Sequence, residues 1–545
     1  MLPANSSAAV LMPLLLRATA SLTTLATRGR SLLTSVEFRA AVVATAGTLA
    51  SYGSVLLLEH RAGLHVDVIV LAVAIGAMLG PTRRGDDQRD RLVSFAVLPL
   101  SAAAANEIAT LMSRHPPAGD TLFALGVGAA VWLRRFGPRF AQSSTMVTVP
   151  LVAVLIAPVP PDAGVVHALW VAAAATITLA WITAVHWLAE RLGCLPPARR
   201  EAVGSVRPEG AMAERRGLSA RLRPSTRMAV QMAASVGLAF ALGRAIFPGH
   251  WNWSVLTGYI VCSGNRGRAD VLYKGLLRVA GASVGTAAAA GVIGLFAPGD
   301  PLAVVAIFAV LFLATWLRPF SYAYWAGCIT AALALLYGYF GETGFHLLRE
   351  RLEAILLGAV LAIVASWLIL PIKTTNVFRQ RAATALAALS DILTALRSQQ
   401  EELGRRQRRF ATAVAGLEQI EPPLRAHRRL FARSRPCAQP VDVIDALRSC
   451  RLCTETITAI VVASPGSVGD LAPIMDDTSR LVAEARRTLA GRHTPDRSSQ
   501  HFDDPQRPSP AVAPSDRLGL AMIELHSTAG QLSRFLSTAG LIRMR

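Results

Sequence analysis

A basic cluster is the part of this chain with the clearest capacity for binding chemistry. Lys274 and Arg278 stand one helical turn apart, and Gly281 and Gly285 follow. A guanidinium binds a carboxylate through two parallel hydrogen bonds, and an ammonium attracts the same group as a point charge. The spacing therefore indicates a binding site for an organic anion. The alternative is that each charge only fixes the orientation of its helix in a membrane.

Aromatic residues extend this candidate site. Trp251 and Trp253 stand two residues apart, and Tyr324 follows in a later apolar stretch. Their rings are suited to stacking on an aromatic substrate. The alternative for the tryptophans is anchoring at the membrane interface, which is their commoner use in membrane proteins.

Two more ionisable residues fall in or beside apolar stretches, where charge is costly and often functional. Glu107 lies late in one stretch and is a candidate proton-coupling carboxylate, the alternative being a glutamate at the membrane interface. Arg351 opens another stretch with Glu350 and Glu353 beside it. It is therefore either part of a substrate path or a member of an ion pair.

Neither catalysis nor metal binding is predicted. Cys450 and Cys453 form a lone pair of cysteines with no histidine at ligand spacing, so we expect no metal or other cofactor. The run Gly281-Ala-Ser283-Val-Gly285 matches the nucleophile elbow of hydrolases, but that motif needs a strand, a turn and a helix. Here the glycines lie in an apolar stretch at four-residue spacing, which is typical of close helix packing. We expect a protein that is not an enzyme.

Apolar stretches dominate the chain and must position these side chains. Of the 545 residues, 52% are hydrophobic, and the mean hydropathy of +0.42 is too apolar for an ordinary soluble enzyme. A membrane span needs about 20 mostly apolar residues. Twelve stretches approach this length, and we predict an all-α integral membrane protein with a helix at 38–58, 64–80, 92–112, 119–133, 145–160, 165–189, 227–247, 252–264, 275–297, 301–317, 320–340 and 351–371.

The basic residues set the predicted orientation. If the N-terminus is cytoplasmic, roughly 21 arginines and lysines fall on the cytoplasmic side of the spans and 5 on the other side. Cytoplasmic loops carry such an excess in membrane proteins. We therefore predict twelve spans in the plasma membrane, with both termini cytoplasmic. The net charge of +20 belongs largely to these loops, and no nucleic-acid partner is predicted.

The two sets of six stretches resemble each other. Arg39 and Arg227 each open a set, and Trp132-Leu-Arg matches Trp316-Leu-Arg at a nearly equal distance along the chain. Six spans in each set make both sets run in the same direction. We therefore predict two parallel six-helix repeats, 38–190 and 227–372, related by an axis along the membrane normal.

The remaining segments are predicted to be cytoplasmic. We expect an amphipathic lead-in at 1–37 and a basic linker at 191–226. Apolar residues recur at helical spacing over 373–545, which predicts a helical domain with a mobile segment at 493–515. Arginines at 405–409 favour anionic lipid headgroups, the alternative being a solvated helix face. The domain is also a candidate surface for a protein partner or for a homo-oligomer.

The second repeat resembles the fusaric acid resistance family of aromatic acid exporter-like inner-membrane proteins. Three features carry the resemblance: an aromatic-rich helix start, a basic turn, and a helix that opens with R-x-x-G-x-x-x-G. They are His250-Trp251-Asn252-Trp253, then Arg266 and Lys274, then Arg278-Val-Ala-Gly281-Ala-Ser-Val-Gly285. The resemblance covers about 227–372. The first repeat lacks a clear second glycine of the pattern after Arg91.

The resemblance implies efflux of organic acids, aromatic acids among them. The chain has no phosphate-binding loop of its own, so the energy would come from an ion gradient or a partner. We therefore predict a gradient-driven efflux transporter for small organic anions. Two alternatives stay open. One is a passive anion channel on the same pair of repeats, as in the distant plant malate channels. The other is a non-transporting membrane scaffold for envelope or secretion machinery.

Overall fold

The computed structural model describes most of the two predicted repeats and of the C-terminal region. The described residues are 36–82, 88–157, 160, 164–195, 222–293, 295–342, 344–398, 402–431, 439–463, 471–490 and 517–538. Every regular element in these ranges is helical. Almost all of the predicted lead-in at 1–37, most of the linker at 191–226 and the whole segment 493–515 lie outside the described residues.

Twelve α-helices occupy the described parts of the two predicted repeats. Those of the first are α3 (Val36–Ala62), α4 (Asp67–Leu79), α5 (Gln88–Arg114), α6 (Pro116–Leu133), α7 (Pro138–Ala153) and α8 (Val165–Arg191). Those of the second are α10 (Pro224–Ile246), α11 (Trp251–Cys262), α12 (Arg268–Ile293), α13 (Pro301–Leu317), α14 (Tyr322–Tyr339) and α15 (Phe345–Leu368). The twelve predicted helices are confirmed. The helices α7, α12 and α15 begin six or seven residues earlier than predicted, because their first turns contain polar or charged residues and are still helical.

Six of these helices are long and apolar enough to cross a bilayer: α3, α5, α8, α10, α12 and α15. The shorter helices α4 and α11 have 13 and 12 residues. At about 1.5 Å per residue each is roughly 20 Å long, short of the bilayer's apolar core of about 30 Å. The prediction of membrane-spanning helices therefore holds for the six long ones.

Long and short helices follow the same order in both repeats. In the first repeat, the first, third and sixth helices have 27 residues each, and the others have 13, 18 and 16. In the second repeat, the corresponding long helices have 23, 26 and 24 residues, and the short ones 12, 17 and 18. The second helix is the shortest in each repeat.

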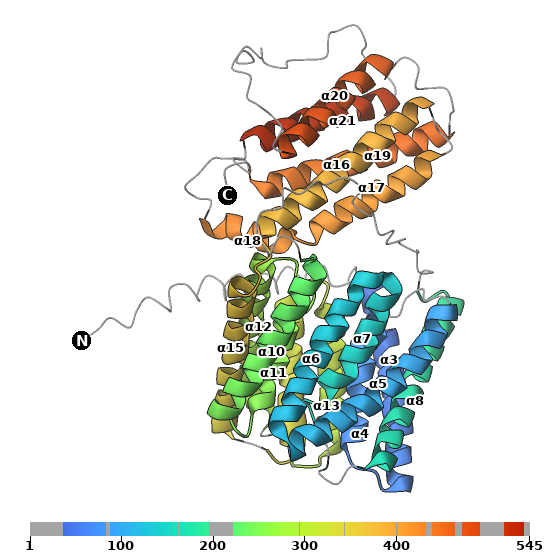
Figure 1. Cartoon of the computed structure of the whole chain (residues 1–545). Coiled ribbons are helices and arrows are strands. Elements are labelled where there is room, and N and C mark those ends of the chain that lie inside the picture. The colour runs from blue at the N-terminus through green and yellow to red at the C-terminus, as the bar shows by residue number, and fades with distance from the viewer. Residues whose placement is uncertain are drawn as a thin grey trace, which may run out of the picture. The chain divides into compact units, whose positions relative to one another are not determined.

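The chain divides into two compact units, and the first contains most of both repeats: Met1–Arg200, Met232–Val261 and Gly275–Ala362. Within it, α3 packs along α4 and α8, and α5 packs along α7 and α8 (Figure 1). Ile75, Leu98 and Leu179 are fully buried among these helices. The Ser51 and Thr178 hydroxyls, 2.6 Å apart, join α3 to α8 inside this apolar core.

Aromatic pairs join the repeats, and two of them are equivalent. Tyr52 on α3 meets Phe308 on α13 with ring centroids 5.1 Å apart, and Phe240 on α10 meets Phe123 on α6 at 5.4 Å. In each pair, the first helix of one repeat contacts the fourth helix of the other. The contact between a first and a fourth helix therefore occurs twice, once from each repeat to the other.

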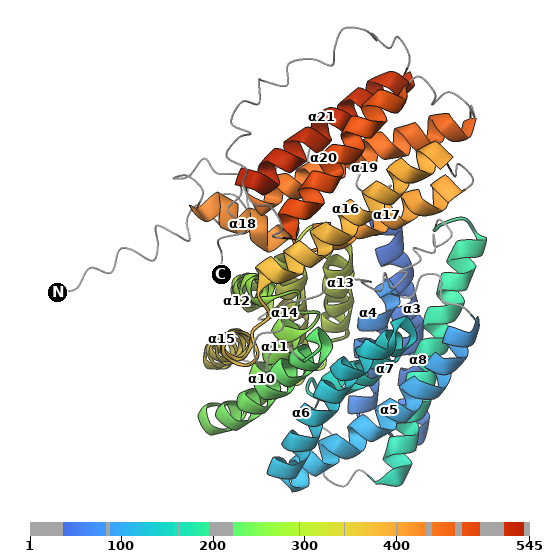
Figure 2. The same ribbon diagram turned by 45° about the horizontal axis from the view of Figure 1, so that its top comes forward.

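The second unit combines the C-terminal helices with the ends of three membrane-region helices: Glu201–Gln231, Cys262–Lys274 and Ile363–Arg545. Its helices are α16 (Thr374–Ser398), α17 (Leu403–Glu418), α18 (Glu421–Phe431), α19 (Pro440–Ala463), α20 (Ala472–Leu489) and α21 (Arg517–Thr538). Figure 2 shows α20 beside α21, and both enclose the core with α16, α17 and α19. Phe378, Leu389, Phe410, Leu447 and Leu525 are buried in that core.

Polar side chains of the second unit enclose the end of α15. Gln231 Nε2 donates to the carbonyls of Ile369 and Leu370 at 2.9 and 3.1 Å, and Arg227 donates to the Leu370 carbonyl at 3.2 Å. Asn265 Nδ2 donates to Gln231 Oε1 at 2.9 Å. The last carbonyls of a helix have no donor within the helix. Side chains from α10 supply such donors here, and Asn265, in the turn after α11, holds the Gln231 amide in place.

Candidate functional site

Arg278 on α12 is fully buried and has one edge without a partner. Its Nη1 donates to the carbonyl of Ala326 at 3.2 Å and to Thr330 Oγ1 at 3.3 Å, both on α14. Its Nε and Nη2 atoms have no hydrogen-bond partner in the described part of the chain. The guanidinium is therefore held from one side by neutral groups, and its charge is not balanced by a carboxylate in an ion pair among those residues.

Facing glycines explain why α14 comes so close to Arg278. A Cβ on Gly281 would lie 2.4 Å from the carbonyl oxygen of Ala323, and one on Gly285 would lie 2.2 Å from that of Gly327. No side chain fits at such distances. The packing role predicted for Gly281 and Gly285 is confirmed, and this close approach brings the α14 backbone within hydrogen-bond range of the guanidinium.

Lys274, one turn before Arg278, is engaged in the turn between α11 and α12. Its Nζ lies 2.8 Å from Asp270 Oδ2 and donates to the carbonyls of Ser263 and Gly264 at 3.2 and 3.3 Å. Because these partners already surround the ammonium, Lys274 closes the turn. The role of Lys274 in binding an anion stays a prediction, and its ammonium is paired with Asp270 in this structure.

The aromatic residues at the start of α14 lie about one turn before the partners of Arg278. Tyr322 and Trp325 form a ring pair with centroids 5.5 Å apart. Tyr324, the residue singled out from the sequence, is half-buried between them in the chain and is not a member of this ring pair. The hydropathy pattern marks all three aromatic residues equally, so it does not reveal which two pack together.

A second buried arginine, Arg351 on α15, packs against two aromatic rings. Its Cζ lies 4.0 Å from the ring centroid of Tyr337 and 5.6 Å from that of Trp253. Its Nη2 donates to Glu342 Oε2 at 3.3 Å. The expected ion pair therefore exists, but its partner comes from the loop before α15 rather than from the neighbouring positions of the same helix. Of the predicted site residues, Arg351 and Trp253 are the two that meet in the contacts of the described chain.

Arg244, which packs on Trp251, and Asn252 connect the second repeat to the first. The guanidinium of Arg244 lies 4.0 Å from the Trp251 ring centroid and forms two hydrogen bonds with Asp120, at 2.7 and 2.8 Å. Asn252 Nδ2 donates to the carbonyl of Leu155 at 2.9 Å. Sequence reasoning missed Arg244 and Asp120. The available signal was their opposite charge at adjoining helix ends, but the sequence does not show that they face each other.

Glu107, the candidate for proton coupling, is exposed on α5. The preceding residue, Asn106, is buried, and neither atom of its amide has a hydrogen-bond partner among the described residues. The buried polar group of this region is therefore the amide, while the carboxylate lies on the outward face of the helix.

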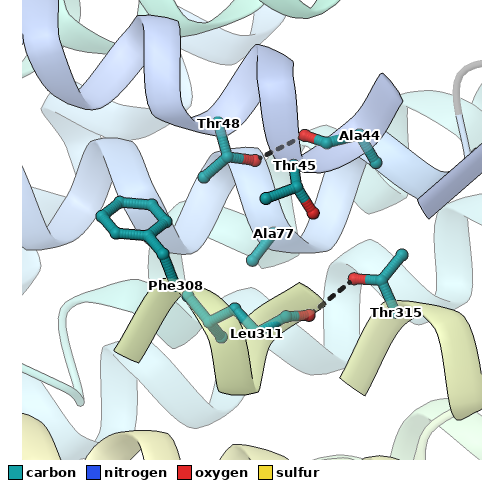
Figure 3. A pocket seen from close by; sticks show the side chains of 7 residues that line it. All are labelled: Ala44, Thr45, Thr48, Ala77, Phe308, Leu311 and Thr315. Carbon is teal, nitrogen blue, oxygen red and sulfur yellow. Dashed lines mark hydrogen bonds between the residues drawn. The ribbon is translucent and has the colours of Figure 1, made fainter. Parts of the chain in front are cut away.

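A small pocket lies between α3, α4 and α13 (Figure 3). It is lined by Ala44, Thr45, Thr48, Ala77, Phe308, Leu311 and Thr315. The hydroxyls of Thr48 and Thr315 donate to carbonyls of their own helices at 2.8 and 3.0 Å. Because both hydroxyl protons are already donated within the helices, the pocket offers mainly apolar surface to a ligand. None of the predicted site residues lines it.

Comparison with known proteins bears on the second repeat. Residues 233–365 match a family described as fusaric acid resistance protein-like. The matched range includes Arg278, Arg351 and the glycines that pack α12 on α14. No curated protein matches the chain. Together with the six long apolar helices, the match confirms the resemblance first indicated by the aromatic start, the basic turn and the glycine pattern. The second repeat of this integral membrane protein is thus similar, over residues 233–365, to the fusaric acid resistance protein-like family.

Proposed function

We propose that this protein exports organic carboxylates, aromatic acids among them, across the plasma membrane, and that Arg278 binds the carboxylate. The observation that carries the proposal is the unpartnered edge of this buried guanidinium. Burying a charge without a counter-charge is costly. An ionisable side chain in a membrane helix is therefore a functional-site hypothesis by default.

The geometry of the guanidinium suits a carboxylate. The Nε and Nη2 hydrogens point the same way from one edge, and this edge matches the two oxygens of a carboxylate. Nη1 is held by Ala326 and Thr330, which fixes the plane of the group. An incoming carboxylate supplies two hydrogen bonds and the missing counter-charge at once. The site accordingly favours the ionised acid over its neutral form.

The aromatic pair on α14 supports a preference for aromatic acids. Tyr322 and Trp325 stand about one turn from the helix positions that hold Arg278. Aromatic rings attract one another in stacked or edge-to-face arrangements. A substrate with a ring attached to its carboxylate would therefore gain a contact that an aliphatic acid lacks.

The proposed architecture is a pair of parallel repeats around an axis along the membrane normal, with cytoplasmic termini and C-terminal helices. The matching order of helix lengths and the reciprocal contacts of Tyr52 with Phe308 and of Phe240 with Phe123 support it. Trp132 and Trp316 support it as well, since each is the last residue but one of its repeat's fourth helix.

The two shortest helices support a transport path near the middle of the bilayer. In transporters built from repeats, unusually short apolar segments at corresponding positions of the two halves point to the binding site. Here α4 and α11 are the second helices of their repeats and have 13 and 12 residues. The chain runs from α11 through a single turn into α12, which carries Arg278.

Reconstitution into proteoliposomes tests this function. We expect uptake of benzoate and 4-hydroxybenzoate driven by a proton gradient, with slower uptake of acetate. Arg278→Gln should reduce the apparent affinity by roughly tenfold to over a hundredfold, because a hydrogen bond to a charged group contributes about 1.5–3 kcal/mol. Arg268→Gln is the matched control, since Arg268 is the first residue of the same helix and its guanidinium lies 5.0 Å from the ring centroid of Trp367.

Each contrary outcome selects a different function. Benzoate flux that is independent of the proton gradient would indicate a channel. Absence of flux for every acid in the panel, from protein that is folded and inserted, would favour the scaffold. Equal transport by Arg278→Gln and Arg268→Gln would remove Arg278 from the site.

A further inference from the structure

Three side chains form a compact polar group where α4 and α8 begin. Asp67, the first residue of α4, is buried, with 5% of its side chain exposed. Its Oδ1 lies 2.9 Å from His65 Nδ1, and its Oδ2 lies 2.9 Å from His167 Nε2. His167 is on the first turn of α8 and is mostly buried, whereas His65 precedes α4 and is exposed. Both oxygens of one carboxylate thus face imidazole rings.

A second group of the same composition lies where α11 and α15 begin. Glu350 on α15 has its Oε2 3.0 Å from His250 Nδ1 and its Oε1 4.0 Å from His346 Nδ1. His250 directly precedes α11 and is mostly buried, whereas His346 is exposed. One carboxylate again stands between a buried and an exposed imidazole.

The two groups occupy corresponding places in the repeats. Each bridges the start of the second helix to the start of the sixth. In the first repeat the second helix supplies the carboxylate and the sixth supplies the buried imidazole. In the second repeat these roles are exchanged. The same bridge is therefore made with its two residues exchanged between the helices. A requirement for the His–carboxylate pair explains this exchange better than a requirement for one residue at one position.

We propose that these two groups are the proton-binding sites that couple transport to the proton gradient, an inference that rests on the proposed transport function. Imidazole is the side chain whose ordinary titration falls between about pH 5 and pH 8. A carboxylate within hydrogen-bond distance supplies the counter-charge of the imidazolium. In each group, the exposed imidazole gives protons a route from water to the buried one. No group of such side chains in the described residues has the arrangement of a metal site.

The arginines nearest to Glu350 are paired with other carboxylates, so they do not replace the histidines as its partners. Beside the second group, Arg349 is paired with Glu353 at 2.8 Å, and Arg351 is paired with Glu342 at 3.3 Å. Neither arginine forms an ion pair with Glu350 among the described contacts. Beside the first group, the end of α3 that leads into α4 carries Glu59, His60 and Arg61.

A bound proton would change how the short helices are held. With the imidazole neutral, each bridge is a single hydrogen bond to a carboxylate. With the imidazole protonated, the bridge becomes an ion pair, in which the attraction of opposite charges adds to the hydrogen bond. Protonation therefore tightens the start of α4 on α8 and the start of α11 on α15. Since α11 leads into the helix of Arg278, this step connects proton binding to the anion site.

The test compares driven transport with exchange that needs no gradient. The double variant Asp67→Asn with Glu350→Gln keeps the size of both side chains and removes their charge. We expect proton-driven accumulation of benzoate in proteoliposomes to fall by about tenfold or more, in the range typical of coupling between sites. Exchange of labelled for unlabelled benzoate at equal pH should stay within about twofold. Asp300→Asn is the matched control, because the Asp300 carboxylate caps α13 by accepting from the Leu302 amide at 2.8 Å.

The outcomes distinguish failure of the proton-site inference from failure of the proposed transport function. Loss of accumulation with retained exchange supports the proton sites, whereas accumulation equal to that of the Asp300→Asn control overturns them. If the wild type shows no benzoate exchange, the proposed function fails. In that case proton uptake by the purified protein tests the proton sites directly. It is measured as the pH is lowered from about 8 to about 5. The double variant should take up fewer protons than the control, and equal uptake would refute the inference.

Discussion

The close contact of α12 with α14 allows a sharp prediction for Gly285→Ala. A Cβ at this position would lie 2.2 Å from the carbonyl oxygen of Gly327. Carbon and carbonyl oxygen come no closer than about 3.3 Å in the tightest ordinary contacts. The added methyl group must therefore push the two helices apart by about 1 Å. Because the obstacle is backbone, no side-chain rotation relieves the contact.

This separation costs energy in two ways. Inserting a carbon into a well-packed interface typically costs about 1–3 kcal/mol. The bonds from Arg278 to Ala326 and Thr330, now 3.2 and 3.3 Å long, would also lengthen beyond hydrogen-bond range. We expect a destabilisation of at least about 2 kcal/mol, which changes the unfolding equilibrium roughly 30-fold.

The assay is thermal unfolding in detergent, with Gly291→Ala as the control. Gly291 lies on the same helix, and a Cβ there meets nothing within 4 Å. An alanine in an open helical position is neutral or stabilises slightly. We expect Gly285→Ala to melt several degrees below the wild type and Gly291→Ala to melt at or above it. Equal melting of the two variants would mean that α12 and α14 do not touch at Gly285.

Two further predictions concern the two compact units separately. Asp120→Asn and Arg244→Gln should each destabilise the protein by about 1–3 kcal/mol in thermal unfolding, because each leaves one charge of a mostly buried pair without its partner. The double variant should cost less than the sum, and strict additivity would show that the pair contributes nothing. In the C-terminal helices, burial raises the pKa of Cys450 from 9.0 to about 12 and that of Cys453 from 9.0 to about 11. The unfolded thiols ionise near 9.0, so their contribution to stability is complete below that pH and is lost as the pH rises toward 11 and 12. Maleimide should label the exposed Cys194 at neutral pH and reach the two buried thiols only after unfolding, and rapid labelling of all three would contradict this burial.

The helices were predictable because their signal is local. Apolar runs and polar breaks located all twelve helices of the repeats, most of them within a few residues, and α13 (Pro301–Leu317) begins and ends as predicted. The largest errors are the starts of α7, α12 and α15, which lie six or seven residues earlier than predicted. The glycines after Arg278 were equally readable, since small residues at four-residue spacing have one common use in apolar helices. The length of α4 was predicted less well: the stretch 64–80 became a helix at Asp67–Leu79, whereas α11 has nearly the predicted length.

The candidate site was predictable in residue type but not in arrangement. The position of Arg278 was visible, yet its open edge depends on which atoms α14 presents, and that follows from packing. Lys274 carries the same charge one turn earlier, but Asp270 engages it. The bonds of Asp120 with Arg244 and of Asp67 with His167 join residues about a hundred positions apart. Such pairs are set by the fold, and one sequence offers no means to choose them.

The polar enclosure at the end of α15 bears on how deletion experiments must be designed. Chain beyond residue 373 looks like an appendage, but it forms one unit with the ends of α10, α12 and α15. Thr374 Oγ1 accepts from the Ala269 amide at 3.1 Å, and Arg266 donates to the Gln419 carbonyl at 3.3 Å. A stop codon at residue 373 would strip bonding partners from the basic turn itself. Inactivity of such a truncated protein would then report damage to the remaining structure, so point changes on the outer faces of α20 or α21 are the better test of a role for the C-terminal helices.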